Sequence, residues 1–403
     1  MLKNTIKAGV VALVVSAVPF FSASAATAAS TATTASVKTP FYYGAWVPYW
    51  TSTAGEQQIA VNLDSLNEVS PFSYEIVSGG AILDDLKIGS GVWNGWISAV
   101  KSANVKVIPT IAWFDSTGIY NLLSVSKTRQ AEEDSIAALV KNNNFDGIDI
   151  DFEAMSPATR PYYSLFIEGL VQRLHPAGEK LTCTVVPRDD PSSIYVVVPK
   201  TLNYAENYSV LNQYCDEVRL MAYDQGTTDL KLDATKGGNG TLYAPTADPD
   251  WVTKIVQYAI QYINPKKVML GVPTYGYEYE VSWSNNVTTY QEVRAWDYFG
   301  AMDRADSLGI APVRDNAGEL SFTFTSSTYI QEPQILTTYV SSTEPAVLLT
   351  THDPNASTTF FVSFPDAVSE LQKVTVAKKY GLRGVMFFKA DGDIDPSIWN
   401  SLN

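Results

Sequence analysis

The sequence predicts a (β/α)8 barrel, and two observations carry this prediction. From about residue 41 onward, apolar runs rich in β-branched and aromatic residues alternate eight times with helix-like segments over roughly 360 residues. Polar or aromatic residues crowd the C-terminal ends of most runs, the end at which such barrels carry their functional residues. An open doubly wound sheet is the alternative, but no Gly-rich phosphate turn follows the first run.

The eight predicted strands are short apolar runs of high β propensity. In order along the chain they are residues 41–50, 66–77, 105–114, 145–153, 180–187, 216–224, 267–276 and 382–388. Between them the apolar period is helical, as in residues 129–143, 163–178 and 366–381. About 85 residues separate the seventh strand from its helix and contain strand-like pieces at 319–325 and 345–353. A connection this long indicates a functional insertion or a small subdomain.

The N-terminus has the features of an export signal. Lys3 and Lys7 precede an apolar run at residues 8–21, and small residues follow it up to Ala25. This order predicts a secretory signal peptide at residues 1–25, cleaved after Ala25, and therefore a secreted protein. An uncleaved membrane anchor is the alternative, but the apolar run is too short to span a bilayer comfortably.

The rest of the chain is predicted to be a linker followed by one domain. Residues 26–40 are rich in Ala, Thr and Ser and are predicted to be flexible, which leaves residues 41–403 as the ordered domain. The formal charge is −14, and loss of two lysines with the signal peptide brings it to −16. A chain this acidic repels nucleic acid and anionic lipid. We therefore expect a monomer that binds a neutral ligand, with no nucleic-acid partner and no membrane contact after cleavage.

The chain has two cysteines, Cys183 and Cys215. Export to an oxidising compartment permits a disulfide between them. Two buried free thiols are equally compatible with the sequence, because the bond depends on geometry that the sequence does not contain.

Residues 146–153, DGIDIDFE, place three acids at alternate positions of an apolar run. On a strand, Asp149, Asp151 and Glu153 point to one face and the apolar residues between them point to the other. In a barrel the apolar face packs under the helices, and the acids point into the lumen. Neighbouring acids on one face, roughly 6.5 to 7 Å apart at the backbone, repel each other and are poorly solvated, which raises the pKa of at least one. The run therefore predicts a proton donor near neutral pH.

Salt bridges or a metal ion could also account for three buried acids. Salt bridges are disfavoured because Arg188 is the sole basic residue near the lumen ends of the neighbouring strand runs. A metal site would usually recruit further carboxylates or histidines, whereas His175 and His352 fall at a helix end and in a loop. Both possibilities stay open, but the pattern favours acid–base chemistry with no metal and no cofactor.

The acids also match a known pattern. Asp146 and the three acids after it reproduce DxxDxDxE, which resembles the signature of glycoside hydrolase family 18, the chitinase family. Further matches in the family's order are MAYD at 221–224, GVPTYGYEY at 271–279 and KKYGLRGVMFF at 378–388. The resemblance covers about residues 41–400 and implies a barrel with a small α+β insertion at about residues 278–350, between strand 7 and helix 7. Asp146 has the opposite strand parity and is expected to be structural.

The resemblance implies a glycosidase and a role for each acid. Glu153 is expected to be the general acid that protonates the glycosidic oxygen, with the substrate's own 2-acetamido carbonyl as nucleophile and retention as the outcome. Asp151 is expected to hydrogen-bond the acetamido N–H, with Asp149 behind it sharing the proton. Tyr223 would hold the acetamido oxygen, and Asp224 would position the sugar at subsite −1.

This mechanism requires a 2-acetamido sugar, so chitin or chitooligosaccharides are the implied partners. The third strand has Thr110 for the hydroxyl expected near the acids, but Ala112 and Trp113 replace the two glycines of the Ser-x-Gly-Gly typical of chitinases. In this the chain resembles bacterial cell-wall and spore-cortex lytic enzymes, and peptidoglycan is the alternative substrate. A chitin-binding lectin on the same barrel is an alternative of another class, and the presence of Glu153 argues against it.

Aromatic and polar residues near strand ends are candidates for binding the sugar rings. Phe388 stands where the family usually has Trp, as the floor of subsite −1, and offers less apolar area. The predicted substrate-binding residues are Asp224, Met221, Phe388, Tyr275, Trp113 and Tyr74, with Tyr277 and Trp283 as further aromatic candidates.

Overall fold

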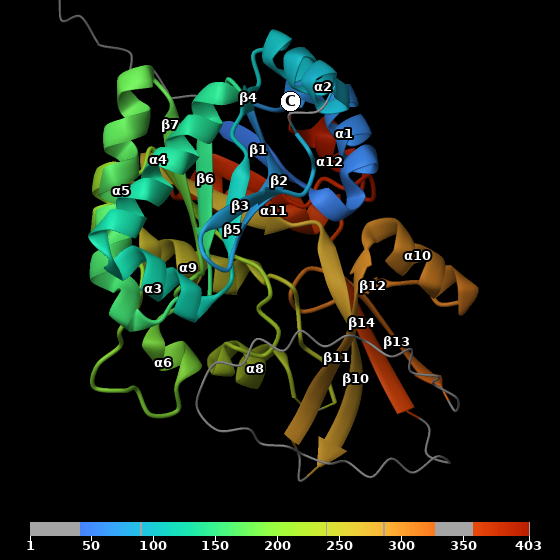
Figure 1. The fold of residues 1–403 in the computed structure, drawn as a ribbon. Coiled ribbons are helices and arrows are strands. Elements are labelled where there is room, and N and C mark those ends of the chain that lie inside the picture. The colour runs from blue at the N-terminus through green and yellow to red at the C-terminus, as the bar shows by residue number, and fades with distance from the viewer. Residues whose placement is uncertain (1–40, 89–90, 239, 285–286, 327–357, 403) are drawn as a thin grey trace, which may run out of the picture. The chain divides into compact units, whose positions relative to one another are not determined.

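The structure is a computed structural model, and its described residues belong to the compact unit Pro40–Asn403 (Figure 1). The described ranges are 41–88, 91–238, 240–284, 287–326 and 358–402. The predicted signal peptide and linker, residues 1–40, lie outside them, as does the strand-like piece expected at 345–353.

Eight parallel strands form a closed barrel, which confirms the predicted fold. They are β1 (Tyr42–Pro48), β2 (Glu68–Val77), β5 (Thr110–Trp113), β6 (Gly147–Phe152), β7 (Lys180–Val185), β8 (Glu217–Leu220), β9 (Val268–Pro273) and β15 (Gly384–Phe388). Neighbours follow chain order, and β1 pairs with both β2 and β15, which closes the ring. The short β4 (Lys106–Val107) pairs with β2 ahead of β5, and β3 (Ala81–Asp84) adds an antiparallel partner to β2.

Helices pack around the barrel on the outward faces of the strands (Figure 1). They are α1 (Ser52–Val61), α2 (Gly91–Ser102), α3 (Ser116–Ser124), α4 (Ser126–Asn142), α5 (Arg160–Leu174), α7 (Tyr208–Tyr214), α9 (Pro249–Ala259), α11 (Ala367–Lys379) and α12 (Ser397–Ser401). Two short helices, α6 (Pro191–Ile194) and α8 (Leu230–Lys236), lie in the connections after β7 and β8 and contact each other. Several begin at Asp or Asn residues whose side chains accept hydrogen bonds from first-turn N–H groups, as Asp248 does for α9. No helix among the described residues is long and apolar enough to cross a bilayer.

The connection between β9 and α11 is an α+β insertion, as expected. Its antiparallel strands are β10 (Tyr275–Ser284), β11 (Val287–Asp297), β12 (Val313–Arg314), β13 (Leu320–Ser326) and β14 (Thr358–Phe364), in the order β11-β10-β14-β13-β12. Helix α10 (Tyr298–Ser307) packs on one face of this sheet through Ala301 and Ala305. The sheet spans residues 275–364 and so extends beyond the expected 278–350 on both sides.

A disulfide joins Cys183 and Cys215, with an S–S distance of 2.07 Å. Cys183 lies on β7 and Cys215 just before β8, and both are buried. The bond therefore ties two neighbouring barrel strands together on the helix-covered side, and it settles the question that the sequence left open.

Candidate active site

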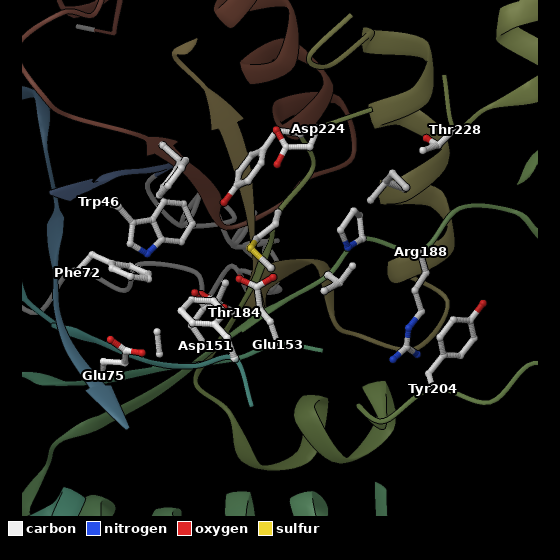
Figure 2. A pocket seen from close by; sticks show the side chains of 18 of the residues that line it. Trp46, Phe72, Glu75, Asp151, Glu153, Thr184, Arg188, Tyr204, Asp224 and Thr228 are labelled. Atoms are coloured by element: carbon white, nitrogen blue, oxygen red, sulfur yellow. The ribbon is translucent and has the colours of Figure 1, made fainter. Parts of the chain in front are cut away.

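Strand β6 places the acidic run as its alternation predicts. Asp149 and Asp151 are buried and face the lumen, whereas Ile148 and Ile150 belong to the apolar core under the helices. Glu153 follows directly after the strand end and lies next to Asp151 (Figure 2). The next residue, Ala154, has a positive φ of 53°, so the chain turns away immediately after Glu153.

Asp149 lies deepest and is surrounded by hydrogen-bond donors. Its carboxylate oxygens lie within hydrogen-bonding distance of Trp46 Nε1 (3.3 Å), Thr110 Oγ1 (2.9 Å), Thr182 Oγ1 (2.8 Å) and Thr184 Oγ1 (2.9 and 3.0 Å). The hydroxyl expected from Thr110 is therefore present. No hydrogen bond joins Asp149 to Asp151 among the described residues. The proton that these two acids were expected to share would need such a bond.

A buried arginine pairs with this acid, so a salt bridge, which the sequence disfavoured but left open, is part of the site. Arg219 Nη1 lies 3.1 Å from Asp149 Oδ2, and Arg219 Nη2 lies 3.0 Å from Glu68 Oε1. All three side chains are fully buried in the lumen. Strand parity could have found this residue, because Arg219 shares its face with Met221, which was predicted to bind substrate.

Two carboxyl groups above Asp149 have raised pKa values. Burial raises the pKa of Asp151 well above its usual range, the charges of Glu153 and Asp149 raise it further, and Arg219 opposes them. Asp151 Oδ1 is buried without a hydrogen-bond partner among the described residues. Burial is the largest cause that raises the pKa of Glu153, and the charges of Asp224 and Glu206 add to it. Together they raise this pKa to about 7. The site therefore holds acids that keep protons near neutral pH, as predicted.

Asp224 is held in place from the insertion. It lies just beyond the end of β8 with a positive φ of 61°, which Asp tolerates better than most residues. Its Oδ1 accepts hydrogen bonds from Tyr275 Oη at 2.5 Å and Tyr277 Oη at 2.7 Å. Burial raises the pKa of Asp224, although these two bonds oppose the shift.

These side chains line a cavity of about 590 Å³ at the C-terminal end of the barrel. Figure 2 shows Phe72 and Glu75 toward one end, Arg188 and Tyr204 toward the other, and Glu153 between them. Seven predicted site residues line it, together with Trp46: Tyr74, Asp151, Glu153, Met221, Tyr223, Asp224 and Phe388. The ring of Tyr223 stacks on Phe388 at 5.4 Å between centroids. The cavity is thus a cleft with apolar walls and a carboxyl group at its centre.

Three aromatic predictions need correction. Trp113 is 2% exposed and packs on Phe152 in the core, because its strand parity is opposite to that of Ala112, which lines the cavity. Tyr275 is buried behind the wall, where it contacts Asp224 and Phe388 instead of the cavity. Trp283 is 54% exposed and lies outside this cavity.

Sequence reasoning missed Glu206 besides Arg219, and it placed Arg188 near the lumen without giving it a role. Glu206 lies close enough to raise the pKa of Glu153, and it pairs with Arg188 at 2.8 Å. The Arg188 guanidinium lies between the rings of Tyr204 and Tyr208, 4.0 and 3.9 Å from their centroids. These residues lie in or next to the long connection between β7 and α7, which carries no strand alternation that could have indicated them.

Comparison with known proteins decides the family. The family model described as glycosyl hydrolases family 18 matches residues 45–393, most of the chain. The chain belongs to glycosyl hydrolases family 18. Cleavage of a glycosidic bond is the activity that the description of this family names.

Relatives of this family 18 protein include chitinases and cortex-lytic enzymes. It is 24% identical to the uncharacterized glycosylase YvbX of Bacillus subtilis over 52% of this chain and 55% of the relative. It is 25% identical to chitinase A1 of Niallia circulans over 74% of this chain and 42% of the relative. The chain thus spans about half the length of these curated relatives.

Solved structures share the fold of this family 18 protein. The spore cortex-lytic enzyme SleL of Bacillus megaterium matches 90% of this chain and 73% of its own, with a TM-score of 0.65 and 19% identity. A class V chitinase of Pseudomonas fluorescens matches 90% of this chain and 98% of its own, with a TM-score of 0.66 and 20% identity. Both likenesses support the barrel.

Proposed function

We propose that this protein is a secreted hydrolase that cleaves β-1,4-linked N-acetylglucosamine glycans, chitin or chitooligosaccharides, with retention. The observation that carries the proposal is the pair Asp151 and Glu153, both with raised pKa values, at the centre of an aromatic-lined cleft. Relatives named as chitinases support the same conclusion. The proposal that it is secreted rests on the sequence of residues 1–25.

In the proposed reaction Glu153 protonates the glycosidic oxygen while the acetamido carbonyl of the substrate attacks C1. Asp151 accepts a hydrogen bond from the acetamido N–H, which directs the carbonyl oxygen toward C1. Tyr223 lines the same cleft and donates its phenolic proton to the acetamido oxygen. Phe388, stacked on Tyr223, supplies the apolar floor beneath the sugar.

Peptidoglycan is the second candidate, and the likeness to cortex-lytic enzymes favours it. The charges of the cleft favour chitin. Among the lining residues Arg188 is the one cation, and its guanidinium already pairs with Glu206. Six acids line the cleft beside this one paired cation, so the lining offers no free positive charge to the carboxylates of muramyl peptides. We therefore rank chitin first.

The test is reducing-sugar release from colloidal chitin and, separately, from purified peptidoglycan. Cleavage of chitin alone supports the first proposal, and cleavage of peptidoglycan alone supports the second. Binding of either polymer without cleavage would support the lectin alternative and contradict both.

The pH dependence of the reaction follows from Glu153. Its pKa is about 7 and its protonated form is the proposed donor, so kcat/KM should be retained below pH 7 and fall as pH rises through about 7. A pH profile of kcat/KM with a soluble chitooligosaccharide measures this decrease. A profile that stays flat to about pH 9 would contradict the assignment of Glu153 as the acid.

Replacement of Phe388 by Trp should strengthen binding at subsite −1. Trp offers a larger apolar face to the sugar, and KM for chitooligosaccharides should fall by roughly threefold or more, as expected for about 1 kcal/mol of aromatic contact. Steady-state kinetics of Phe388→Trp measure the effect, with Phe152→Trp in the core as a control for general repacking. Unchanged kinetics would show that Phe388 is not a platform.

A further inference from the structure

Residues 195–198, Tyr-Val-Val-Val, form an apolar run in the connection between β7 and α7, and all four are exposed. Val196 is 91% exposed and Val197 is 83% exposed, the two highest values among the large apolar side chains that the structure describes. No charged residue occurs between Asp190 and Lys200. A contiguous apolar patch that stays in water marks an interaction site.

The exposed run begins at the wall of the candidate active site. Ile194, directly before the run, lines the cavity, and so does Val186, which is 44% exposed. Tyr204, which follows the run, lines the cavity at the end where Arg188 lies (Figure 2). The run therefore continues the apolar wall of the cleft outward.

A group of tyrosines lies at the same end of the cleft. Burial raises the pKa of the Tyr204 hydroxyl, and three neighbouring tyrosines raise it further while Arg188 opposes them. These neighbours are Tyr258, Tyr195 and Tyr262. The rings of Tyr258 and Tyr262 lie 5.6 Å apart, and Tyr262 is 46% exposed. Because Tyr195 belongs both to this group and to the exposed run, residues 195–198 and Tyr262 form one outer apolar surface.

Contacts on both sides hold the exposed run in place. The Arg188 guanidinium lies 4.0 Å from the centre of the Tyr204 ring and 3.9 Å from that of Tyr208, which fixes the cleft wall after the run. Helix α6 precedes the run, and Lys231 Nζ on α8 donates to its Ser192 Oγ at 2.6 Å. A surface held in this way loses little conformational freedom when a ligand binds.

We propose that the outer apolar surface binds distal sugar units of a long, uncharged glycan chain whose scissile bond lies at Glu153. This rests on the proposed function and extends it from the bond that is cleaved to the length of the substrate. Apolar side chains pack against the C–H faces of pyranose rings, and the hydroxyls of Tyr195 and Tyr262 can bond to sugar hydroxyls. A chain that leaves the cleft past Tyr204 then lies on this surface.

Charge argues against two other occupants of the outer apolar surface. The chain carries a formal charge of −14, so a second copy of it and an anionic lipid surface would both be repelled. An uncharged glycan meets no such repulsion. The wall that it would follow out of the cleft is already apolar.

The test compares a short substrate with a polymer. Two variants are made, the double variant Val196→Ser with Val197→Ser and the single variant Tyr262→Ala. In each, the apparent Kd for insoluble chitin should rise by roughly threefold or more. We expect kcat/KM for an N-acetylglucosamine trisaccharide to stay within about twofold of the wild type. So short a chain has at most two units on either side of the bond at Glu153.

Val61→Ser is the matched control. Val61 is 80% exposed at the end of α1 and does not line the cavity, so its replacement should change neither value. A rise in Kd for Val61→Ser equal to that of the double variant would show a general effect of surface polarity and overturn the proposal. An unchanged Kd in both test variants would overturn it too, as would an equal loss on trisaccharide and polymer.

Two further outcomes separate the alternatives. Analytical ultracentrifugation would reveal a wild-type dimer that the double variant converts to a monomer, and this result would give the surface to a second copy and overturn the proposal. If the wild type binds insoluble chitin but cleaves no N-acetylglucosamine glycan, the proposed hydrolysis fails. The binding measurement needs no turnover, so a raised Kd in the two test variants would still support the outer apolar surface as a glycan site.

Discussion

Glu153→Gln should reduce kcat on chitooligosaccharides by roughly 100- to 10,000-fold, the range expected for loss of a general acid. Gln keeps the size and hydrogen-bonding capacity of the side chain but carries no proton to give to the leaving oxygen. KM should change little, because the aromatic walls of the cleft are untouched. Steady-state kinetics with a soluble oligosaccharide measure both parameters.

The same variant should be more stable than the wild type at alkaline pH. The folded-state pKa of Glu153 is raised from 4.5 to about 7, so ionisation opposes folding, with no cost below about pH 4.5 and the full cost above about pH 7. Glu153→Gln removes this cost. Its free energy of unfolding should exceed that of the wild type by on the order of 3 kcal/mol at pH 8 and should equal it at pH 4. Thermal unfolding at both pH values measures the gain.

Glu132→Gln is the matched control. Glu132 lies on α4, is 5% exposed, and burial alone raises its pKa to about 7. It lies outside the cavity, so its replacement should raise stability at pH 8 in the same way and leave kcat unchanged. If both variants lose activity alike, the loss in Glu153→Gln reflects buried packing and not acid catalysis.

Asp151→Asn should be the second most damaging change, with kcat reduced by roughly 100-fold or more. Asn can still accept a hydrogen bond from the acetamido N–H, but it cannot carry the negative charge that strengthens this bond as positive charge develops on the substrate. Single-turnover and steady-state kinetics separate the loss in chemistry from any loss in binding.

Asp151→Asn should also raise stability while it lowers activity. The pKa of Asp151 is raised by burial, so ionisation of Asp151 opposes folding as pH rises, and Asp151→Asn should unfold at a higher temperature than the wild type at neutral pH. Asp233→Asn is a suitable control, because burial raises the pKa of Asp233 to about 7 on α8, away from the cleft. Full activity of Asp151→Asn would remove Asp151 from the mechanism.

Local patterns in the sequence are sufficient wherever a residue's direction depends on its own strand. Alternation along β6 correctly places Asp149 and Asp151 in the lumen and the isoleucines between them in the core. The same alternation along β5 puts Trp113 on the outward side and Ala112 on the inward side. The prediction that Trp113 binds sugar was wrong because it rested on residue type and not on this parity.

Residue order alone was enough to predict the barrel, its insertion and the acids of β6, because hydrophobic period and strand parity are properties of contiguous residues. The closed barrel was needed to reveal which lumen side chains meet. Arg219 contacts Ser70 across 149 residues of sequence, and Trp46 contacts Asp149 across 103. Those partners are set by the register of eight strands around a ring, and that register appears only when the chain is folded.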